Sequence, residues 1–173
     1  MAKILMIVAQ NGFRDEELFV PKELLEKAGH KVKVASINRS KATGSMGAVI
    51  VPDMGVYEAN PDFFDVVIIV GGPGSPALSE NNEVLHFVER MNAMDKIVAA
   101  ICLGPMTLAK AGVLGKKKAT VFRDRSAVQL LRESGAVYLM QSVVKDENIV
   151  TGDSPDSAEE FGKAIIAVLK ERS

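Results

Sequence analysis

The chain has 173 residues, of which 47% are hydrophobic and 25% are charged, and its formal net charge is −1. This length and composition predict one compact domain over residues 1–173 with a full hydrophobic core. Without an excess of positive charge the chain lacks the field that holds a phosphate backbone, so we expect no nucleic-acid partner. No apolar run reaches the ~18 residues of a membrane span, and the N-terminal run lacks a small-residue cleavage site. We therefore expect a cytoplasmic protein without a membrane partner.

Apolar, β-branched runs recur along the first two thirds of the chain and are separated by segments with helical spacing. The runs span residues 4–8, 32–35, 66–70 and 97–101. The helical segments span residues 23–28, which stop at Gly29, and residues 83–94. On the second helix one face carries Val84, Phe87, Val88 and Met91. This order predicts an α/β fold whose parallel strands are buried on both faces.

A proline and three acidic residues define the start of the first helix. Pro21 is unfavourable inside a helix, so the helix either begins near it or bends there. Asp15, Glu16 and Glu17 then lie just before the first turn or within it.

Three further helices and two hairpins are predicted, all in the second half of the chain except the hairpin at residues 42–51. Short helices are predicted at residues 105–111 and 126–134, each followed by a glycine. Residues 42–51 and 143–151 are typical of β-hairpins at sheet edges. Residues 157–170 form an amphipathic helix, for which Ser157 is a candidate cap reinforced by Glu160.

Residues that directly follow the apolar runs are the candidates for chemistry, because open α/β sheets bind ligands at the carboxyl ends of their strands. After the fourth run the sequence reads Cys102-Leu103-Gly104-Pro105 and then a helix. A strand, a tight turn and a helix are the layout of a nucleophile elbow, which lifts the nucleophile clear of the sheet. A helix N-terminus also favours thiolate over thiol. The alternative is a small buried cysteine with a packing role only.

The glycine pair Gly71-Gly72, followed by Pro73-Gly74, lacks both the Lys-Ser/Thr ending of a P-loop and the full dinucleotide fingerprint. A plain tight turn is the simpler interpretation. Beside a nucleophile, backbone N–H groups of this turn and of Leu103 would form a donor pair for a developing oxyanion.

The acidic residues Asp15, Glu16 and Glu17 complement the dipole of the first helix, and this explanation suffices for Asp15 and Glu16. Glu17 is different, because a carboxyl group near the thiol would titrate with it as a pair. Glu17 would donate a hydrogen bond to the thiolate or act as a base toward substrate. The helix dipole and a nearby carboxylate shift the pKa of the thiol in opposite directions, so its direction stays open here.

The two histidines are poor partners for the single cysteine. His30 follows the helix stop and belongs at the amino-terminal end of the next strand, while His86 falls in the middle of a helix. One cysteine and two distant histidines have no metal-ligand spacing. We therefore expect no Cys-His pair, no metal site and no organic cofactor.

Three motifs in fixed order give the chain a family resemblance. They are GFRDEEL at 12–18, VGG at 70–72 and AICLGP at 100–105. Together they resemble the ThiJ/PfpI superfamily over nearly the whole chain, a group that includes intracellular PfpI proteases and a Parkinson's-associated protein deglycase. The resemblance implies a class I glutamine amidotransferase-like fold, which is a flavodoxin-like three-layer sandwich, and a homodimer or higher homo-oligomer.

The resemblance also implies roles for individual residues. Cys102 matches the family's nucleophile or oxidation sensor, Glu17 matches the glutamate that contacts it, and Gly71 and Gly72 match the glycine turn.

The sequence departs from the family pattern at three places. Leu103 stands where PfpI-type proteases have a histidine, and residues 73–76 lack the glutamate that those proteases contribute from a neighbouring subunit. The stretch 120–123 lacks the histidine of some deglycase-like members.

Four functions follow as hypotheses. The first is a stress-protective, glyoxalase- or deglycase-type enzyme, in which Cys102 attacks a small reactive aldehyde or its protein adduct. Glu17 would move a proton, and the N–H groups of Gly72 and Leu103 would stabilise the oxyanion. The second is a redox-sensing or chaperone-like protein without catalysis. The third is a PfpI-type cysteine peptidase, disfavoured because Leu103 is no base, and the fourth is an interaction module that has kept only the fold.

Overall fold

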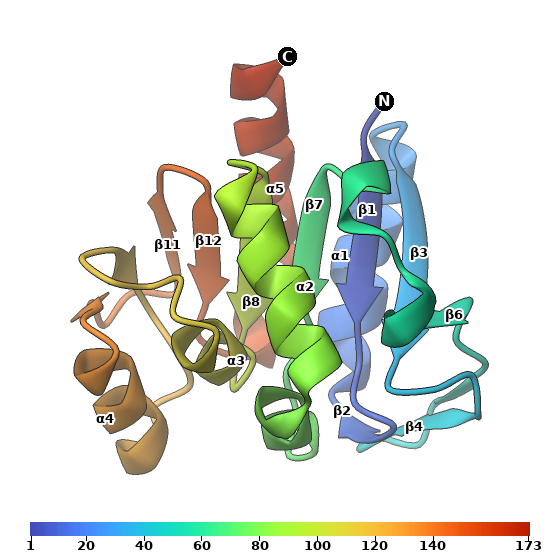
Figure 1. Cartoon of the computed structure of the whole chain (residues 1–173), viewed down its shortest axis with the longest axis horizontal. Helices are drawn as coiled ribbons and strands as arrows, with labels where there is room; N and C mark the ends of the chain where they lie inside the picture. The colour runs from blue at the N-terminus through green and yellow to red at the C-terminus, as the bar shows by residue number, and fades with distance from the viewer.

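The computed structural model describes residues 1–173. Its central sheet has seven strands. Across the sheet these are β11 (Val143–Asp146), β12 (Ile149–Gly152), β8 (Ile97–Ile101), β7 (Val66–Ile69), β1 (Lys3–Ile7), β3 (Lys31–Ser36) and β6 (Met54–Gly55). Every neighbouring pair is parallel except β11 with β12 (Figure 1). The mostly parallel sheet is thus confirmed.

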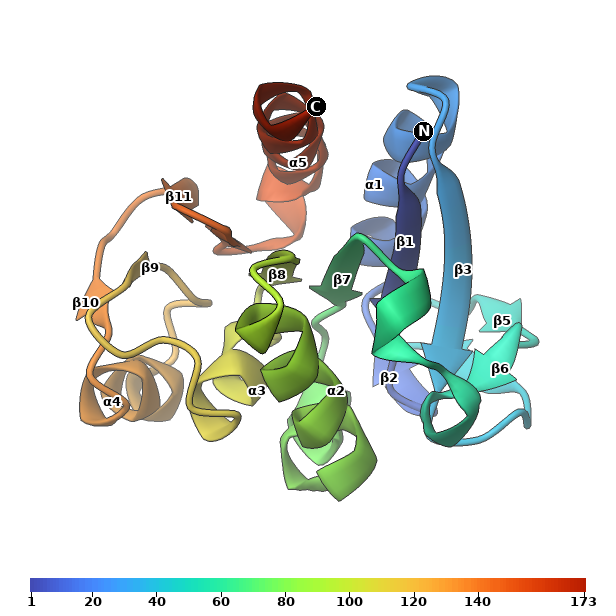
Figure 2. The ribbon, with the colours of Figure 1, turned by 45° about the horizontal axis from the view of Figure 1, so that its top comes forward.

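Helices cover both faces of this sheet and make a three-layer α/β sandwich, as predicted (Figures 1 and 2). One face carries α1 (Asp15–Lys27) and α5 (Ala158–Arg172). The other carries α2 (Asn82–Ala93), α3 (Pro105–Lys110) and α4 (Arg125–Glu133). None of these helices is long and apolar enough to span a membrane.

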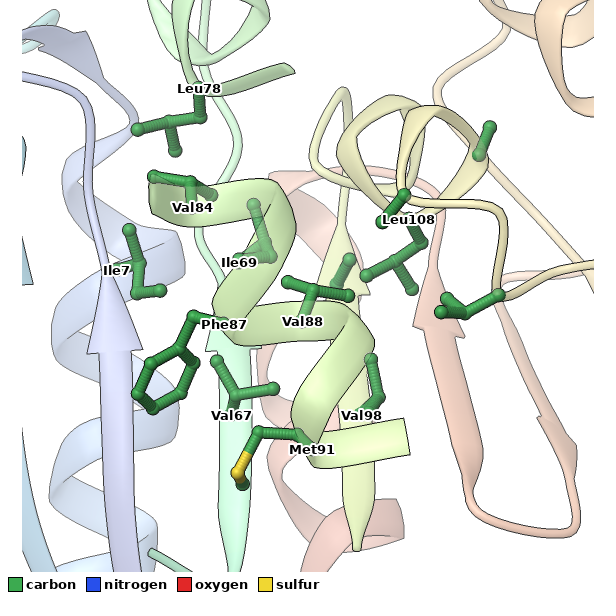
Figure 3. Close-up of a cluster of buried hydrophobic side chains, with 14 of the residues drawn as sticks. Ile7, Val67, Ile69, Leu78, Val84, Phe87, Val88, Met91, Val98 and Leu108 are labelled. Atoms are coloured by element: carbon green, nitrogen blue, oxygen red, sulfur yellow. The ribbon is translucent and has the colours of Figure 1, made fainter. Parts of the chain in front are cut away.

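Alternating strand residues feed two separate hydrophobic clusters, because successive side chains of a strand point to opposite faces. In β1, Leu5 and Ile7 belong to the cluster under α2, whereas Ile4 and Met6 belong to the cluster under α1 and α5. Figure 3 shows the first cluster, where α2 packs on β1, β7 and β8. Its buried helix face is the one that the sequence predicted, with Val84, Phe87, Val88 and Met91.

Helix α1 begins at Asp15, so its three acidic residues lie in the first turn and Pro21 lies inside the helix. Proline has no N–H, and the carbonyl of Glu17, four residues earlier, therefore has no helical donor at this position. The helix ends before Gly29, whose φ of +92° is the left-handed conformation expected after a helix.

Both predicted hairpins form, but only one lies at the edge of the central sheet. β11 and β12 are that edge. β4 (Ala42–Gly44) and β5 (Val49–Ile50) pair antiparallel but join β2 (Asn11–Phe13) in a small separate sheet. The expected edge position was wrong for this hairpin, because β2 offers it a pairing partner outside the main sheet.

Two helix starts differ from the sequence prediction. Helix α4 begins one residue earlier than expected, since Asp124 caps it by accepting from the backbone N–H of Ala127 at 3.0 Å. Ser157 precedes α5 but does not cap it; its hydroxyl donates to Asp153 at 2.6 Å. The expected capping box with Glu160 was therefore wrong: η4, which ends at Ser157, leads directly into α5, so Ser157 lacks the extended backbone of a capping residue and its oxygen accepts no helix N–H.

The remaining elements are short. β9 (Lys118–Ala119) and β10 (Val137–Tyr138) form a two-stranded parallel sheet. Four 3-10 helices are η1 (Val56–Glu58), η2 (Pro61–Phe63), η3 (Ser75–Glu80) and η4 (Pro155–Ser157).

The strand order indicates at which edge of the sheet a ligand would bind. β1 lies between β3 and β7, so the chain crosses to one side after β1 and to the other after β7. Ligands of open α/β sheets bind at the carboxyl ends of strands beside such a switch point. The segments that follow β1, β7 and β8 meet there.

Candidate active site

Cys102 occupies the turn between β8 and α3 with a φ of +61°. A non-glycine residue in this left-handed region is strained, and the surrounding structure must hold it there. Its N–H donates to the carbonyl of Gly152 at 2.9 Å, and its own carbonyl accepts from the N–H of Phe122 at 2.8 Å. The turn has the predicted elbow geometry.

Gly104 completes the elbow because a side chain has no room at this position. A Cβ atom there would lie 2.6 Å from the carbonyl oxygen of Ile69 and 2.8 Å from that of Ile101. Helix α3 therefore starts directly against the ends of β7 and β8.

Gly71 is the point where the carboxyl and the thiol approach each other. A Cβ atom on Gly71 would lie 2.5 Å from Oε1 of Glu17 and 2.7 Å from Cβ of Cys102. Gly72, with a φ of +113°, then turns the chain so that its backbone N–H faces the sulfur. Gly71 therefore permits the close packing of Glu17 against Cys102, and Gly72 permits the close approach of this turn to the backbone of residues 12–14.

Glu17 is fully buried in the first turn of α1. Neither of its carboxyl oxygens has a hydrogen bond of good geometry. Burial raises the pKa of Glu17 to about 8, although the nearby Cys102 thiol, the Gly71 backbone and the Arg14 charge each lower it. The carboxyl group is thus mostly protonated at neutral pH.

The Cys102 side chain is also buried, and only 6% of the residue is exposed. Burial, followed by the charge and the hydrogen bond of Glu17, raises the pKa of Cys102 to about 12. The backbone N–H groups of Gly72 and Leu103 act in the opposite direction and stabilise the thiolate. Burial outweighs these two N–H donors, so the pKa of the thiol rises.

A small pocket opens over the sulfur, with a volume of about 210 Å³. Its lining residues are Arg14, Gly72, Pro73, Cys102, Leu103, Phe122 and Pro155. This volume lies below the range of drug-sized ligand pockets, about 300–1,000 Å³, and suits a small metabolite or the end of a longer chain.

The structure therefore brings all five predicted site residues together: Cys102, Glu17, Gly71, Gly72 and Leu103. The sequence reasoning did not identify the other pocket walls. Pro155 follows β12, which pairs with β8, so the rule of strand carboxyl ends would have found it. Arg14 had one signal, a single basic residue directly before the acidic run.

Asp15 and Glu16 have structural partners rather than a place beside the thiol. The carboxylate of Asp15 accepts from the backbone N–H groups of Met46 and Ala48, and so holds the β4–β5 turn. Glu16 pairs with Arg14 at 2.8 Å.

The histidines lie elsewhere, as predicted. Nδ1 of His30 accepts from the N–H of Ala2 at 3.0 Å, at the opposite end of β1, and His86 is exposed on α2. The pocket lining has no imidazole.

The chain has clear similarity to known proteins. The sequence profile of the DJ-1/PfpI family matches residues 2–168. An uncharacterized protein of Methanocaldococcus jannaschii is 39% identical over 99% of this chain and 84% of its own length. A protein of Thermococcus kodakarensis named as a deglycase is 32% identical over 95% of this chain and 98% of its own. The crystal structure of a ThiJ/PfpI domain protein from Brachyspira murdochii superimposes with a TM-score of 0.94 at 31% identity, covering 99% of this chain and 98% of that one.

Proposed function

The chain belongs to the DJ-1/PfpI family, and from this membership and the Cys102 site we propose a cysteine-dependent enzyme that acts on small reactive aldehydes or their amine adducts. Relatives about 30% identical to the chain are named deglycases, and this supports an enzymatic role. The observation that carries the proposal is Cys102 in a strained elbow, packed against the buried Glu17 and open to a small pocket.

The chemistry follows from the two titratable groups and the turn. Cys102 gives its proton to Glu17 and attacks the aldehyde carbon, so a C–S bond forms and the carbonyl electron pair moves to oxygen. The N–H groups of Gly72 and Leu103, which face the sulfur, would stabilise that oxyanion. Glu17 then returns the proton, and its pKa near 8 suits transfer in both directions near neutral pH.

The overall reaction of methylglyoxal needs no external oxidant or reductant. Hydrogen moves from the aldehyde carbon to the neighbouring carbonyl carbon, which leaves a thioester on Cys102. Water then cleaves the thioester, and methylglyoxal plus water has become lactate.

The alternative functions fit the site less well. A PfpI-type peptidase needs a base beside the nucleophile, and Leu103 occupies that position. A redox sensor needs a low thiol pKa and good access, whereas burial raises the pKa of Cys102. The small pocket beside a proton-carrying pair favours carbonyl chemistry.

The test is methylglyoxal consumption with lactate formation by the wild type and by Cys102→Ser, at equal concentration and with matching circular dichroism. We expect lactate from the wild type and background rates from the variant. Equal lactate from both proteins would refute a cysteine nucleophile, and no turnover by the wild type with methylglyoxal or with glycated amino acids would refute the enzymatic proposal.

A further inference from the structure

Arg14 is the one charged side chain among the residues that line the pocket over Cys102. Its backbone N–H donates to the carbonyl of Gly71 at 2.9 Å, which fixes it against the glycine turn. The other side chains around the sulfur are apolar and come from Pro73, Leu103, Phe122 and Pro155.

The guanidinium group of Arg14 is held in place on one edge only. Nε donates to Oε1 of Glu16 at 3.0 Å, and Nη2 donates to Oε2 at 2.8 Å. Nη1 makes no hydrogen bond within the chain. Guanidinium has five N–H donors, so the pair with Glu16 orients the group and leaves donors free for a ligand.

The charge of Arg14 interacts electrostatically with Glu17 and Cys102. The side chain is 32% exposed, so it borders the pocket from a partly screened position. After the hydrogen bond to Glu16, the charges of Glu17 and Cys102 contribute to raising the pKa of Arg14. Because Arg14 and Cys102 line the same small pocket, a ligand anion bound to Arg14 would sit close to the sulfur.

We propose that Arg14 is a specificity residue, which binds a carboxylate adjacent to the carbon that Cys102 attacks. The preferred ligands are then anionic carbonyl compounds such as 2-oxo acids and the adducts of amino acids with a free carboxylate. Neutral dicarbonyls of the same size offer the free guanidinium donors only uncharged carbonyl acceptors and no carboxylate to pair with. This inference rests on the proposed function for its biological meaning, but the geometry that carries it is independent of turnover.

The alkylating reagents iodoacetate and iodoacetamide test this preference directly at Cys102. In both reactions the sulfur forms a bond to carbon and iodide leaves, so the reagents differ only in carboxylate against amide. We expect the ratio of the iodoacetate rate to the iodoacetamide rate to fall roughly 5- to 10-fold in Arg14→Gln, the effect of one partly exposed charge-assisted hydrogen bond. A change in the shape of the elbow would alter both rates and leave their ratio unchanged.

Three further variants sharpen the result. Arg125→Gln removes the same charge from α4, outside the pocket lining, and should leave the ratio at the wild-type value. Glu16→Gln keeps an acceptor that orients Arg14 but removes a negative charge that repels a ligand carboxylate, so it should raise the ratio. Arg14→Lys should give an intermediate ratio, because lysine keeps the charge but has no guanidinium for a bidentate contact.

A second measurement uses a carbonyl ligand instead of an alkylating reagent. Glyoxylate should protect Cys102 from iodoacetamide at lower concentration than methylglyoxal does, and Arg14→Gln should abolish the difference. An unchanged alkylation ratio in Arg14→Gln, or equal protection by both ligands in the wild type, would overturn the inference. Neither readout requires turnover. If the protein has no activity but its ratio of iodoacetate to iodoacetamide rates still falls in Arg14→Gln, the proposed function is refuted and the role of Arg14 stands.

Discussion

At the scale of single residues, Cys102 and Glu17 act as one titrating pair. Gly71 lets them approach, and burial disfavours a charge on either group. The first proton leaves the pair near pH 8, and the second leaves near pH 12. Between these values the pair holds one proton, which either the carboxyl or the thiol carries.

Glu17→Gln should lower the pKa of Cys102 below about 12, because the charge and the hydrogen bond of the carboxylate raise it in the wild type. The ultraviolet absorbance of the thiolate, titrated with pH, measures this directly. Cys102→Ser supplies the background from the two tyrosines. An unchanged or higher thiol pKa would mean that Glu17 stabilises the thiolate as a protonated donor.

The same substitution should change how stability depends on pH. Glu17 has a folded-state pKa of about 8 and an unfolded value near 4.5, so the folded state holds the proton more tightly. Its contribution to stability is complete below pH 4.5 and is lost as pH rises to about 8, at about 1.4 kcal/mol per pKa unit. Urea unfolding across this pH range should show that the free energy of unfolding falls with this slope in the wild type, and that Glu17→Gln lacks this contribution. Parallel curves would contradict the raised pKa.

The candidate site was predictable at residue scale where the chemistry depends on backbone geometry. The elbow around Cys102, the glycine turn and the acidic first turn of α1 each have a local sequence signal. Arg14 and Pro155 had only weak signals, a basic residue before the acidic run and a place after β12, because what they contact depends on how loops far apart in the chain meet. The direction of the Cys102 pKa also required the structure, since burial decides it.

At the scale of elements, the site depends on helices that start at the carboxyl ends of strands. Helix α1 supplies Glu17, helix α3 follows Cys102, and α2 packs across the strands between them. The periodic pattern of the sequence predicted α2 and α3 well, but for α1 it covered only residues 23–28, whereas the helix begins at Asp15. Caps were less predictable: local sequence does not reveal that a 3-10 turn runs directly into α5, which leaves Ser157 without the extended backbone of a capping residue.

Asn81→Ala should destabilise α2 and leave the chemistry intact. The side-chain oxygen of Asn81 accepts from the N–H of Val84 at 3.0 Å, and Val84 is fully buried. Loss of such a cap costs about 1 kcal/mol. Urea unfolding measures the loss, and the alkylation rate of Cys102 below the transition should match the wild type. A stability equal to wild type would show that water or another group replaces the cap.

At the scale of the whole molecule, one sheet separates two hydrophobic clusters, with α1 and α5 on one face and α2, α3 and α4 on the other (Figure 2). The candidate site lies at the carboxyl end of this sheet. The α/β class and the parallel sheet were predictable, because the buried strands are continuous apolar runs. The separate sheet of β2, β4 and β5 was not, because it depends on a strand of only three residues. The expected homo-oligomer stays a prediction, and sedimentation of the purified chain tests it.

We propose that residues 1–173 fold as one cooperative unit, and core truncations on the two faces test this. Phe161 of α5 and Phe87 of α2 are buried in different clusters. Each substitution to alanine should cost about 3–5 kcal/mol. In both variants far-ultraviolet circular dichroism and tyrosine fluorescence should report the same single transition. Two separated transitions in either variant would contradict one cooperative unit.

The most direct test of the account is the pH profile of lactate formation from methylglyoxal by wild type and Glu17→Gln, with Cys102→Ser as the uncatalysed background. If Cys102 passes its proton to Glu17, the active form is the pair that holds one proton. The rate constant kcat/KM of the wild type should then rise about tenfold per pH unit below pH 8 and level off above it, following the pKa of about 8. Glu17→Gln should be slower throughout and should lack the break near pH 8, although its thiol alkylates faster. The same profile in both proteins would contradict the claim that Cys102 and Glu17 act as a pair.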